Sequence, residues 1–279
     1  MRRLNAIPVH LVPAFYQHAY DRILFMRTED EKPTRALKAI GLYNIITHLL
    51  ADDEETAIST IARKIGMTYQ GILPTTRLLE RVGLVEINKL SVATPFIKHK
   101  QQAMKRCREI RREFGYPIRY EDASTLPHND APAMWHMAYD TLLSGRGKGD
   151  TTAKTLQCMG LLNIIARIAG SNVEVTKAML AKRLDMTAHA LTCHIDYLHR
   201  NNLIEIHEQR SKVSNAREYR IEIPRPMVVH ANKSMLKLWK QVVKAGWEDA
   251  AHLRQMATEL RRKLQTERGE VYKPLSPID

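Results

Sequence analysis

The sequence has few of the residues that build covalent or metal-bound scaffolds. Its three cysteines, Cys107, Cys158 and Cys193, are widely spaced and form no CxxC pair, so neither a disulfide framework nor a zinc ribbon is indicated. No run of about 18 apolar residues occurs, and the start, MRRLNAIPVHLVPAF, lacks the continuous apolar stretch of a signal peptide. We therefore expect a protein of the reducing cytoplasm with no membrane segment.

Acidic residues are also in deficit, so positive charge is in excess. The 279-residue chain has a formal net charge of +13 at pH 7, which attracts polyanions over a long range and makes nucleic acid the first partner to consider. The hydrophobic share of 44% and the charged share of 26% are ordinary for a globular protein. A basic protein with no nucleic-acid partner is the alternative that charge alone leaves open.

The chain repeats itself at a fixed offset of 119 residues. From Leu37 to Ile87, 15 of 51 positions are identical to the residue 119 positions later, among them Gly41 with Gly160. Beyond Ile87 the best offset becomes 131, which matches Pro95 with Pro226. Such self-similarity indicates a duplicated structural unit. We predict two tandem units, at 1–117 and 118–248, and an amphipathic helix with a tail at 249–279.

Each unit has the pattern of a helix, a second helix, a short helix, a turn, a third helix and two strands with a loop between them. In the second unit the apolar spacing predicts helices over 155–169 and 175–186. A third helix is expected from Thr187, whose hydroxyl would cap it, as Thr68 would in the first unit. The strand-like LIEIH follows. The expected fold class is mainly α with small β-hairpins, an α+β protein.

Two phrases of the first unit resemble a known family. IARKIGMT at Ile61–Thr68 and RLLERVGLVEI at Arg77–Ile87 are similar to the winged helix-turn-helix of bacterial MarR-type regulators, over about 60 residues in each unit. The resemblance implies two tandem winged-helix units in a pseudo-dimer, with flanking helices at Pro13–Phe25 and Phe96–Phe114. Such terminal helices dimerise MarR-type subunits, which leaves a further homodimer open. Winged helices that bind only proteins remain an alternative.

In a helix-turn-helix, the second helix enters the major groove and residues near its start reach the bases. In the second unit that helix bears its apolar residues on one face, with polar residues opposite. The following loop places basic residues at a hairpin tip, where they would bind phosphates. The predicted contacts of the second unit are Thr187, His189, Thr192 and Cys193 on the helix, and Arg210, Lys212 and Arg217 on the hairpin.

The first unit departs from this pattern. Its third helix contains Gly71 and Pro74, and because an interior proline costs about 3 kcal/mol, the helix is expected to start late or kink. Its hairpin loop is short, with Lys89 as its only base. The second unit is therefore expected to read DNA principally. The predicted contacts of the first unit are Tyr69, Gln70, Thr75 and Arg77.

The residues assemble no catalytic set that we can identify. His189 and Cys193 are four residues apart and could share a metal, but the spacing offers no further ligands nearby. The glycine-rich SGRGKGD at Ser144–Asp150 lacks the spacing of a phosphate-binding loop and is interpreted as a flexible basic linker. The sequence predicts no enzyme, no cofactor and no metal, and it identifies no small-molecule effector.

The leading hypothesis is a sequence-specific transcription regulator of double-stranded DNA, located in the cytoplasm at the nucleoid. A plasmid-type replication initiator is the first alternative, because that class also resembles two winged-helix domains in one chain. A protein-interaction adaptor is the second. Salt-dependent affinity for DNA separates the first two hypotheses from the adaptor.

Overall fold

A computed structural model describes residues 20, 22–28, 31–52, 56–88, 95–99, 141–142, 146–147, 149–170, 173–210 and 217–227, with the side chains of 48–52, 99 and 170 excepted. These residues form a mixed α/β protein with small antiparallel sheets. The expected α+β class is thereby confirmed. The predicted C-terminal helix at 249–279 lies outside the described residues. Among the described helices, none is long and apolar enough to cross a bilayer.

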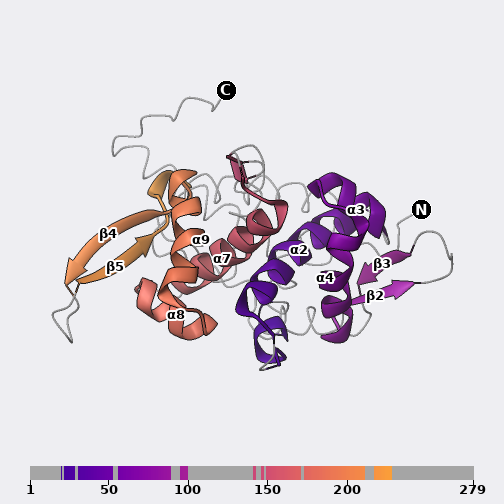
Figure 1. Ribbon diagram of the computed structural model, residues 1–279, viewed down its shortest axis with the longest axis horizontal. Coiled ribbons are helices and arrows are strands. Elements are labelled where there is room, and N and C mark those ends of the chain that lie inside the picture. The colour runs from indigo at the N-terminus through magenta and orange to yellow at the C-terminus, as the bar shows by residue number, and fades with distance from the viewer. Residues whose placement is uncertain are drawn as a thin grey trace, which may run out of the picture.

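The described elements form two halves, each a long helix, two shorter helices and a hairpin (Figure 1). The first half comprises α2 (Pro33–Asp52), β1 (Thr56–Ala57), α3 (Ile58–Ile65), α4 (Tyr69–Arg81), β2 (Val85–Asn88) and β3 (Phe96–His99). The second half comprises α7 (Thr152–Gly170), α8 (Lys177–Leu184), α9 (Ala188–Arg200), β4 (Glu205–Arg210) and β5 (Arg217–Glu222). The helices predicted over 155–169 and 175–186 are confirmed as α7 and α8.

The helices of the two halves keep the offset of 119 residues, but the hairpins do not. Both α3 and α4 begin and end 119 residues before α8 and α9. In the hairpins, Ile87 pairs with Ile97 and Ile206 pairs with Ile221, so the second strands are offset by 221 − 97 = 124. The match of Pro95 with Pro226 was therefore wrong, because Pro95 precedes β3 while Pro226 follows β5. Which residues of the two second strands are equivalent is decided by the pairing of the β strands, and the apolar pattern alone does not fix that pairing.

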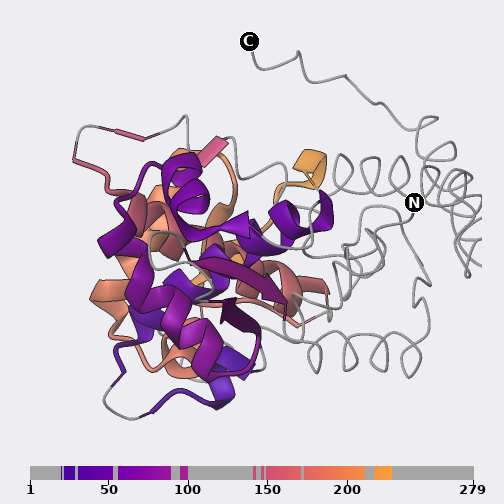
Figure 2. The same cartoon turned by 90° about the vertical axis from the view of Figure 1, so that its right-hand side faces the viewer.

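The long helices α2 and α7 pack against each other at the centre of the molecule, and glycines permit their close approach (Figure 1). A Cβ atom on Gly41 would lie 2.1 Å from the carbonyl oxygen of Leu156, and one on Gly160 would lie 2.1 Å from that of Leu37. Because Leu37 and Gly41 are the repeat partners of Leu156 and Gly160, the contact is reciprocal. In the view along the long axis of the molecule, the two halves lie one behind the other (Figure 2).

A buried pair of amides accompanies the glycines. Asn163 Nδ2 donates to Asn44 Oδ1 at 3.3 Å, and these two asparagines also stand 119 residues apart. Both side chains are buried among leucines and isoleucines of α2 and α7. A buried amide requires a partner to offset its lost hydration, so this pair favours one register of the two helices over slipped alternatives.

The turn between the two shorter helices is built alike in both halves. The residue that ends the first of them is left-handed, with φ of +70° at Gly66 and +54° at Asp185. The next helix starts with a threonine cap: Thr68 Oγ1 accepts from the Gly71 N–H at 3.1 Å, and Thr187 Oγ1 accepts from the Ala190 N–H at 3.2 Å. Both predicted caps are confirmed.

For the first half, the late start expected for the third helix and the second flanking helix were both wrong. Helix α4 begins at Tyr69 and continues through Pro74 to Arg81, so it does not start late. Cations of α2 bond to its carbonyls, Lys38 Nζ to Gly71 O at 3.0 Å and an Arg35 guanidinium N–H to Pro74 O at 3.4 Å. These bonds hold α4 against α2 beside the proline, so tertiary contacts offset part of its cost of about 3 kcal/mol.

The second wrong expectation concerns the flanking helix proposed at Phe96–Phe114. Residues Phe96–His99 form β3, the central strand of a three-stranded sheet ordered β1-β3-β2. The alternation of exposed Phe96 and fully buried Ile97 follows from this strand. Residues 100–114 lie outside the described part of the chain.

Candidate nucleic-acid interface

Helix α9 presents one exposed stripe opposite its buried face. His189, Cys193, Asp196 and Arg200 are exposed at a helical spacing of four, three and four residues. The side chains of Leu191, Ile195 and Leu198 are buried, as the apolar pattern predicted. The cap residue Thr187 is exposed at the start of the stripe. We call His189, Cys193, Asp196 and Arg200 the α9 stripe.

Two polar residues of α9 hydrogen-bond to other groups of the protein: Thr192, which is half-exposed, and His194, which is buried. The Thr192 hydroxyl donates to the Ala188 carbonyl at 2.6 Å, so its proton is already committed. His194 is buried, with Nδ1 2.9 Å from Ala190 O and Nε2 3.0 Å from Gln157 Oε1. Burial lowers the pKa of His194, and the Lys154 ammonium lowers it further, against the raising effect of the Ala190 carbonyl. His194 is therefore part of the packed interior of the second half, where it links α9 to Gln157 of α7.

Helix α4 presents the corresponding stripe in the first half. Gln70, Pro74, Arg77 and Arg81 are exposed at the same spacing, and each stands 119 residues before its counterpart in the α9 stripe. We call these four residues the α4 stripe. Tyr69 is half-buried and packs against the core.

Thr75 cannot contact DNA in this conformation, because only 2% of it is exposed. Its repeat partner is His194, which is also buried. Thr75 therefore belongs to the buried face of α4, and we leave it out of the candidate interface.

The hairpin β4–β5 is basic toward its tip and mixed in charge toward its base. Arg210 pairs with Arg217 at the last position of the ladder before the tip, and Lys212 lies outside the described residues. Arg217 is exposed and forms an ion pair with Glu208, its Nε 3.3 Å from Glu208 Oε1. An exposed pair of this kind contributes about 0–1 kcal/mol, so Arg217 can exchange it for a phosphate at little cost.

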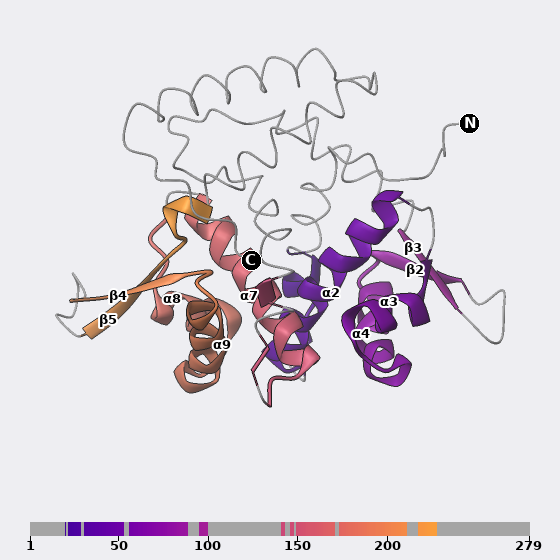
Figure 3. The ribbon, with the colours of Figure 1, turned by 90° about the horizontal axis from the view of Figure 1, so that it is seen from above.

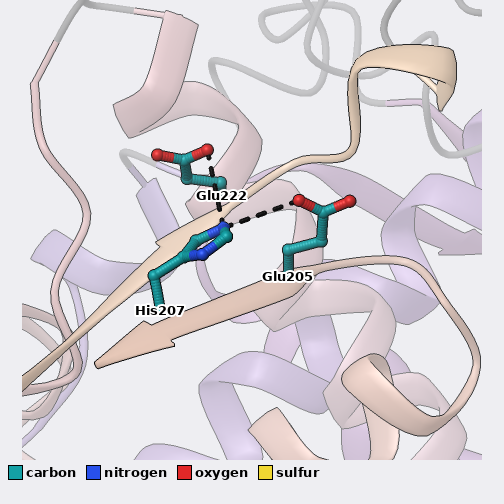
Figure 4. A group of neighbouring side chains, drawn as sticks. All are labelled: Glu205, His207 and Glu222. Atoms are coloured by element: carbon teal, nitrogen blue, oxygen red, sulfur yellow. Dashed lines mark ion pairs between the residues drawn. The ribbon is translucent and has the colours of Figure 1, made fainter.

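Two carboxylates and an imidazole meet at the base of the same hairpin (Figure 4). His207 Nε2 lies 3.5 Å from Glu205 Oε2 and 3.8 Å from Glu222 Oε2. These are groups that can ligate zinc. However, a guanidinium nitrogen of Arg220 already lies 2.5 Å from Glu222 Oε1, and all three side chains are accessible to water. Ion pairing on the hairpin surface accounts for this group.

A buried carboxylate ties the long helix to the third helix in each half. Glu31 pairs with Arg35 at 3.3 Å and with Arg81 at 2.6 Å. In the second half, residues 119 positions later do the same: Asp150 pairs with Lys154 at 3.0 Å and with Arg200 at 2.6 Å. Sequence analysis missed these triads. The identity of Arg81 with Arg200 was visible, but the acids differ in length and so escaped the repeat search.

The segments before the long helices cross between the halves. Arg27 bonds to the Leu184 carbonyl at 2.9 Å and pairs with Asp185 at 2.9 Å. Its repeat partner Arg146 bonds to the Ile65 carbonyl at 3.3 Å. Each arginine thus meets the C-terminal end of a helix in the opposite half, where a cation is favoured. We call this pair of contacts the reciprocal arginine clamps.

The clamps correct the interpretation of Ser144–Asp150 as a flexible linker. Arg146 is bonded as described above, and the Gly147 N–H donates to Asp150 Oδ2 at 2.9 Å. Burial raises the pKa of the Asp150 carboxyl. The Gly147 N–H and the Lys154 ammonium lower this pKa by more, so that the net shift is downward. The described residues of this segment therefore belong to the folded second half.

Helices α4 and α9 lie on the same side of the molecule. In Figure 3, α4 and α9 occupy one side, separated by the central pair α2 and α7, and the hairpins project at the two outer ends. The triads hold each stripe to its own long helix, and the reciprocal arginine clamps hold each half to the other. The arrangement therefore offers one composite surface with two exposed helices. No family model, curated protein or solved structure matches the chain.

Proposed function

We propose that the protein is a sequence-specific transcription regulator that binds double-stranded DNA through two non-identical winged helix-turn-helix units on one chain. The observation that carries the proposal is the pair of helices α4 and α9 on one side of the molecule, each with an exposed stripe and with a hairpin outside it (Figure 3). In this class of protein the second helix of the motif enters the major groove, and flanking elements bind the phosphate backbone.

Charge supports duplex DNA as the partner. The net charge of +13 favours association with a polyanion. Arg210, Arg217 and Lys212 would bind phosphates from the second hairpin, and this affinity falls as salt rises. On the helices, the proposed contacts are Thr187, His189, Thr192 and Cys193 in the second half, and Tyr69, Gln70 and Arg77 in the first. No cofactor is required, and the site of action would be the nucleoid in the cytoplasm.

The contact between α2 and α7 supports a fused pseudo-dimer. In a two-fold interface, residue i contacts residue j and residue j contacts residue i. Gly41 with Leu156 and Gly160 with Leu37 follow this rule at the repeat offset. Since the α4 and α9 stripes differ in sequence, we expect an asymmetric or imperfectly repeated operator, in contrast to the palindrome that an identical dimer selects.

Selection of bound sequences from a random duplex library tests this function. The wild type is compared with a variant carrying Arg210→Ala, Lys212→Ala and Arg217→Ala, and with Arg225→Ala, an exposed arginine beyond the base of the hairpin, as a control. We expect one enriched motif, weaker binding by the hairpin variant and unchanged binding by the control. If nothing enriches and binding merely follows salt, the protein is not a specific regulator. If the protein shows no salt-dependent binding to DNA at all, the adaptor hypothesis replaces that of a DNA-binding regulator.

A further inference from the structure

The two stripes carry different side chains at two equivalent positions, and at one of these positions the charges are opposite. Helix α4 presents Gln70 and Arg77, and α9 presents His189 and Asp196 at the positions 119 residues later. Both helices begin at a threonine cap and run for 13 residues, so these side chains stand at the same height along their helices. The comparison is therefore controlled for position, and only the chemical identity of the side chains differs.

The polar groups of Gln70 and Arg77 have no partner among the residues that the structure describes. Within the described part of the chain, neither side chain forms a hydrogen bond or an ion pair. Arg81 and Arg200, which end the two stripes, are instead committed to Glu31 and Asp150. Gln70 and Arg77 thus need break no internal bond before they meet a ligand.

Base recognition depends on paired donors and acceptors of defined geometry. A glutamine amide can bond to N6 and N7 of adenine together, and an arginine guanidinium can bond to O6 and N7 of guanine together. A carboxylate such as Asp196 only accepts from cytosine N4, and it is repelled by the phosphates on both sides of the groove. The strongest known readers are therefore on α4.

We propose that α4 supplies the sequence-reading contacts of the protein, through Gln70 and Arg77, and that α9 mainly positions the second half on the duplex. The inference rests on the proposed function and reverses the expectation that the second unit reads principally. That expectation depended on two features of the first unit, the proline in its third helix and its short hairpin loop with a single base. The structure removes the first of these, because α4 runs unbroken from Tyr69 to Arg81. The second half then contributes chiefly through its basic hairpin tip.

The experiment repeats the library selection on four single variants in two matched pairs. Gln70→Ala is paired with His189→Ala, and Arg77→Ala with Asp196→Ala, because each pair occupies equivalent positions. All four side chains are exposed, so folding is expected to be unaffected, and thermal unfolding checks this. We expect Gln70→Ala and Arg77→Ala each to flatten one position of the motif and to weaken the best site by about 5- to 150-fold.

Neither α9 variant is expected to flatten a position of the motif. His189→Ala should weaken all sequences alike, as the loss of a positioning contact would, and Asp196→Ala should raise affinity for all sequences slightly. If His189→Ala or Asp196→Ala flattens the motif while Arg77→Ala does not, the inference is overturned and the proposed function stands. If Arg77→Ala weakens all sequences alike and reduces the salt slope by about one, Arg77 binds phosphate and the inference is overturned as well. If the wild type enriches no motif, both the inference and the proposed function are wrong.

Discussion

Replacing Gly41 by alanine tests the close packing of the two long helices. The added Cβ would lie 2.1 Å from the Leu156 carbonyl oxygen and 2.9 Å from the carbonyl carbon, both backbone atoms. Since real Cβ atoms essentially never lie closer than 3.0 Å to such atoms, the helices must separate by about 1 Å at this point. Overpacking of this kind costs typically 1–3 kcal/mol, and the better helix propensity of alanine offsets about 1 kcal/mol. Because the clashing atoms belong to the backbone and cannot turn away, we take the upper end of this range and expect a net loss of about 2 kcal/mol.

Urea unfolding followed by circular dichroism measures this loss. Gly160→Ala should match Gly41→Ala, because its Cβ would meet the Leu37 carbonyl oxygen at the same 2.1 Å. Gly71→Ala is the control: its Cβ would meet only the side-chain ends of Met67 and Thr68, each at 3.2 Å, so no comparable loss is expected. If Gly41→Ala is as stable as the wild type, the helices do not approach at this glycine and the reciprocal packing is refuted.

Three further predictions concern contacts within and between the halves. Arg146→Ala should cost about 1 kcal/mol in urea unfolding, because it removes the bond to the opposite half, and an unchanged midpoint would argue against the clamp. Because burial lowers the pKa of His194, its contribution to the free energy of unfolding should be full above pH 6.5 and fall as the pH drops through that value toward the folded pKa. In His194→Gln, this part of the dependence of the melting temperature on pH should be lost, and thermal unfolding at several pH values measures it. In native protein, iodoacetamide should label exposed Cys193 well before Cys158, whose pKa burial raises to about 12; peptide mass mapping reports the order, and equal labelling would contradict the structure.

Capping and periodicity could be recognised without a structure because they depend on neighbours within a few residues. Thr68 and Thr187 cap helices where expected, since a hydroxyl before a helix satisfies the amide three residues on. The buried face of α9 followed from the i, i+4 and i+7 spacing of Leu191, Ile195 and Leu198. The offset of 119 residues fixed the equivalence of the two sets of helices.

The candidate interface was predicted only in part. The outward position of His189 and Cys193 follows from the apolar face of α9 alone. The burial of Thr75 does not, because a threonine near the start of a helix is compatible with either face, and only the packing of α4 on α2 decides between them. Similarly, nothing in the sequence indicated that the Thr192 hydroxyl turns back onto its own helix.

By itself, the sequence determined the duplication, the order of elements, the helix caps and the excess of positive charge. Tertiary structure decided the continuity of α4 through Pro74, the register of the hairpins, the paired triads and the reciprocal arginine clamps. The division has a physical reason: local signals act over one or two turns of chain, while Arg27 and Leu184 are 157 residues apart. Contacts at that separation exist only once the two halves have packed, and they fix how α4 and α9 are placed relative to each other.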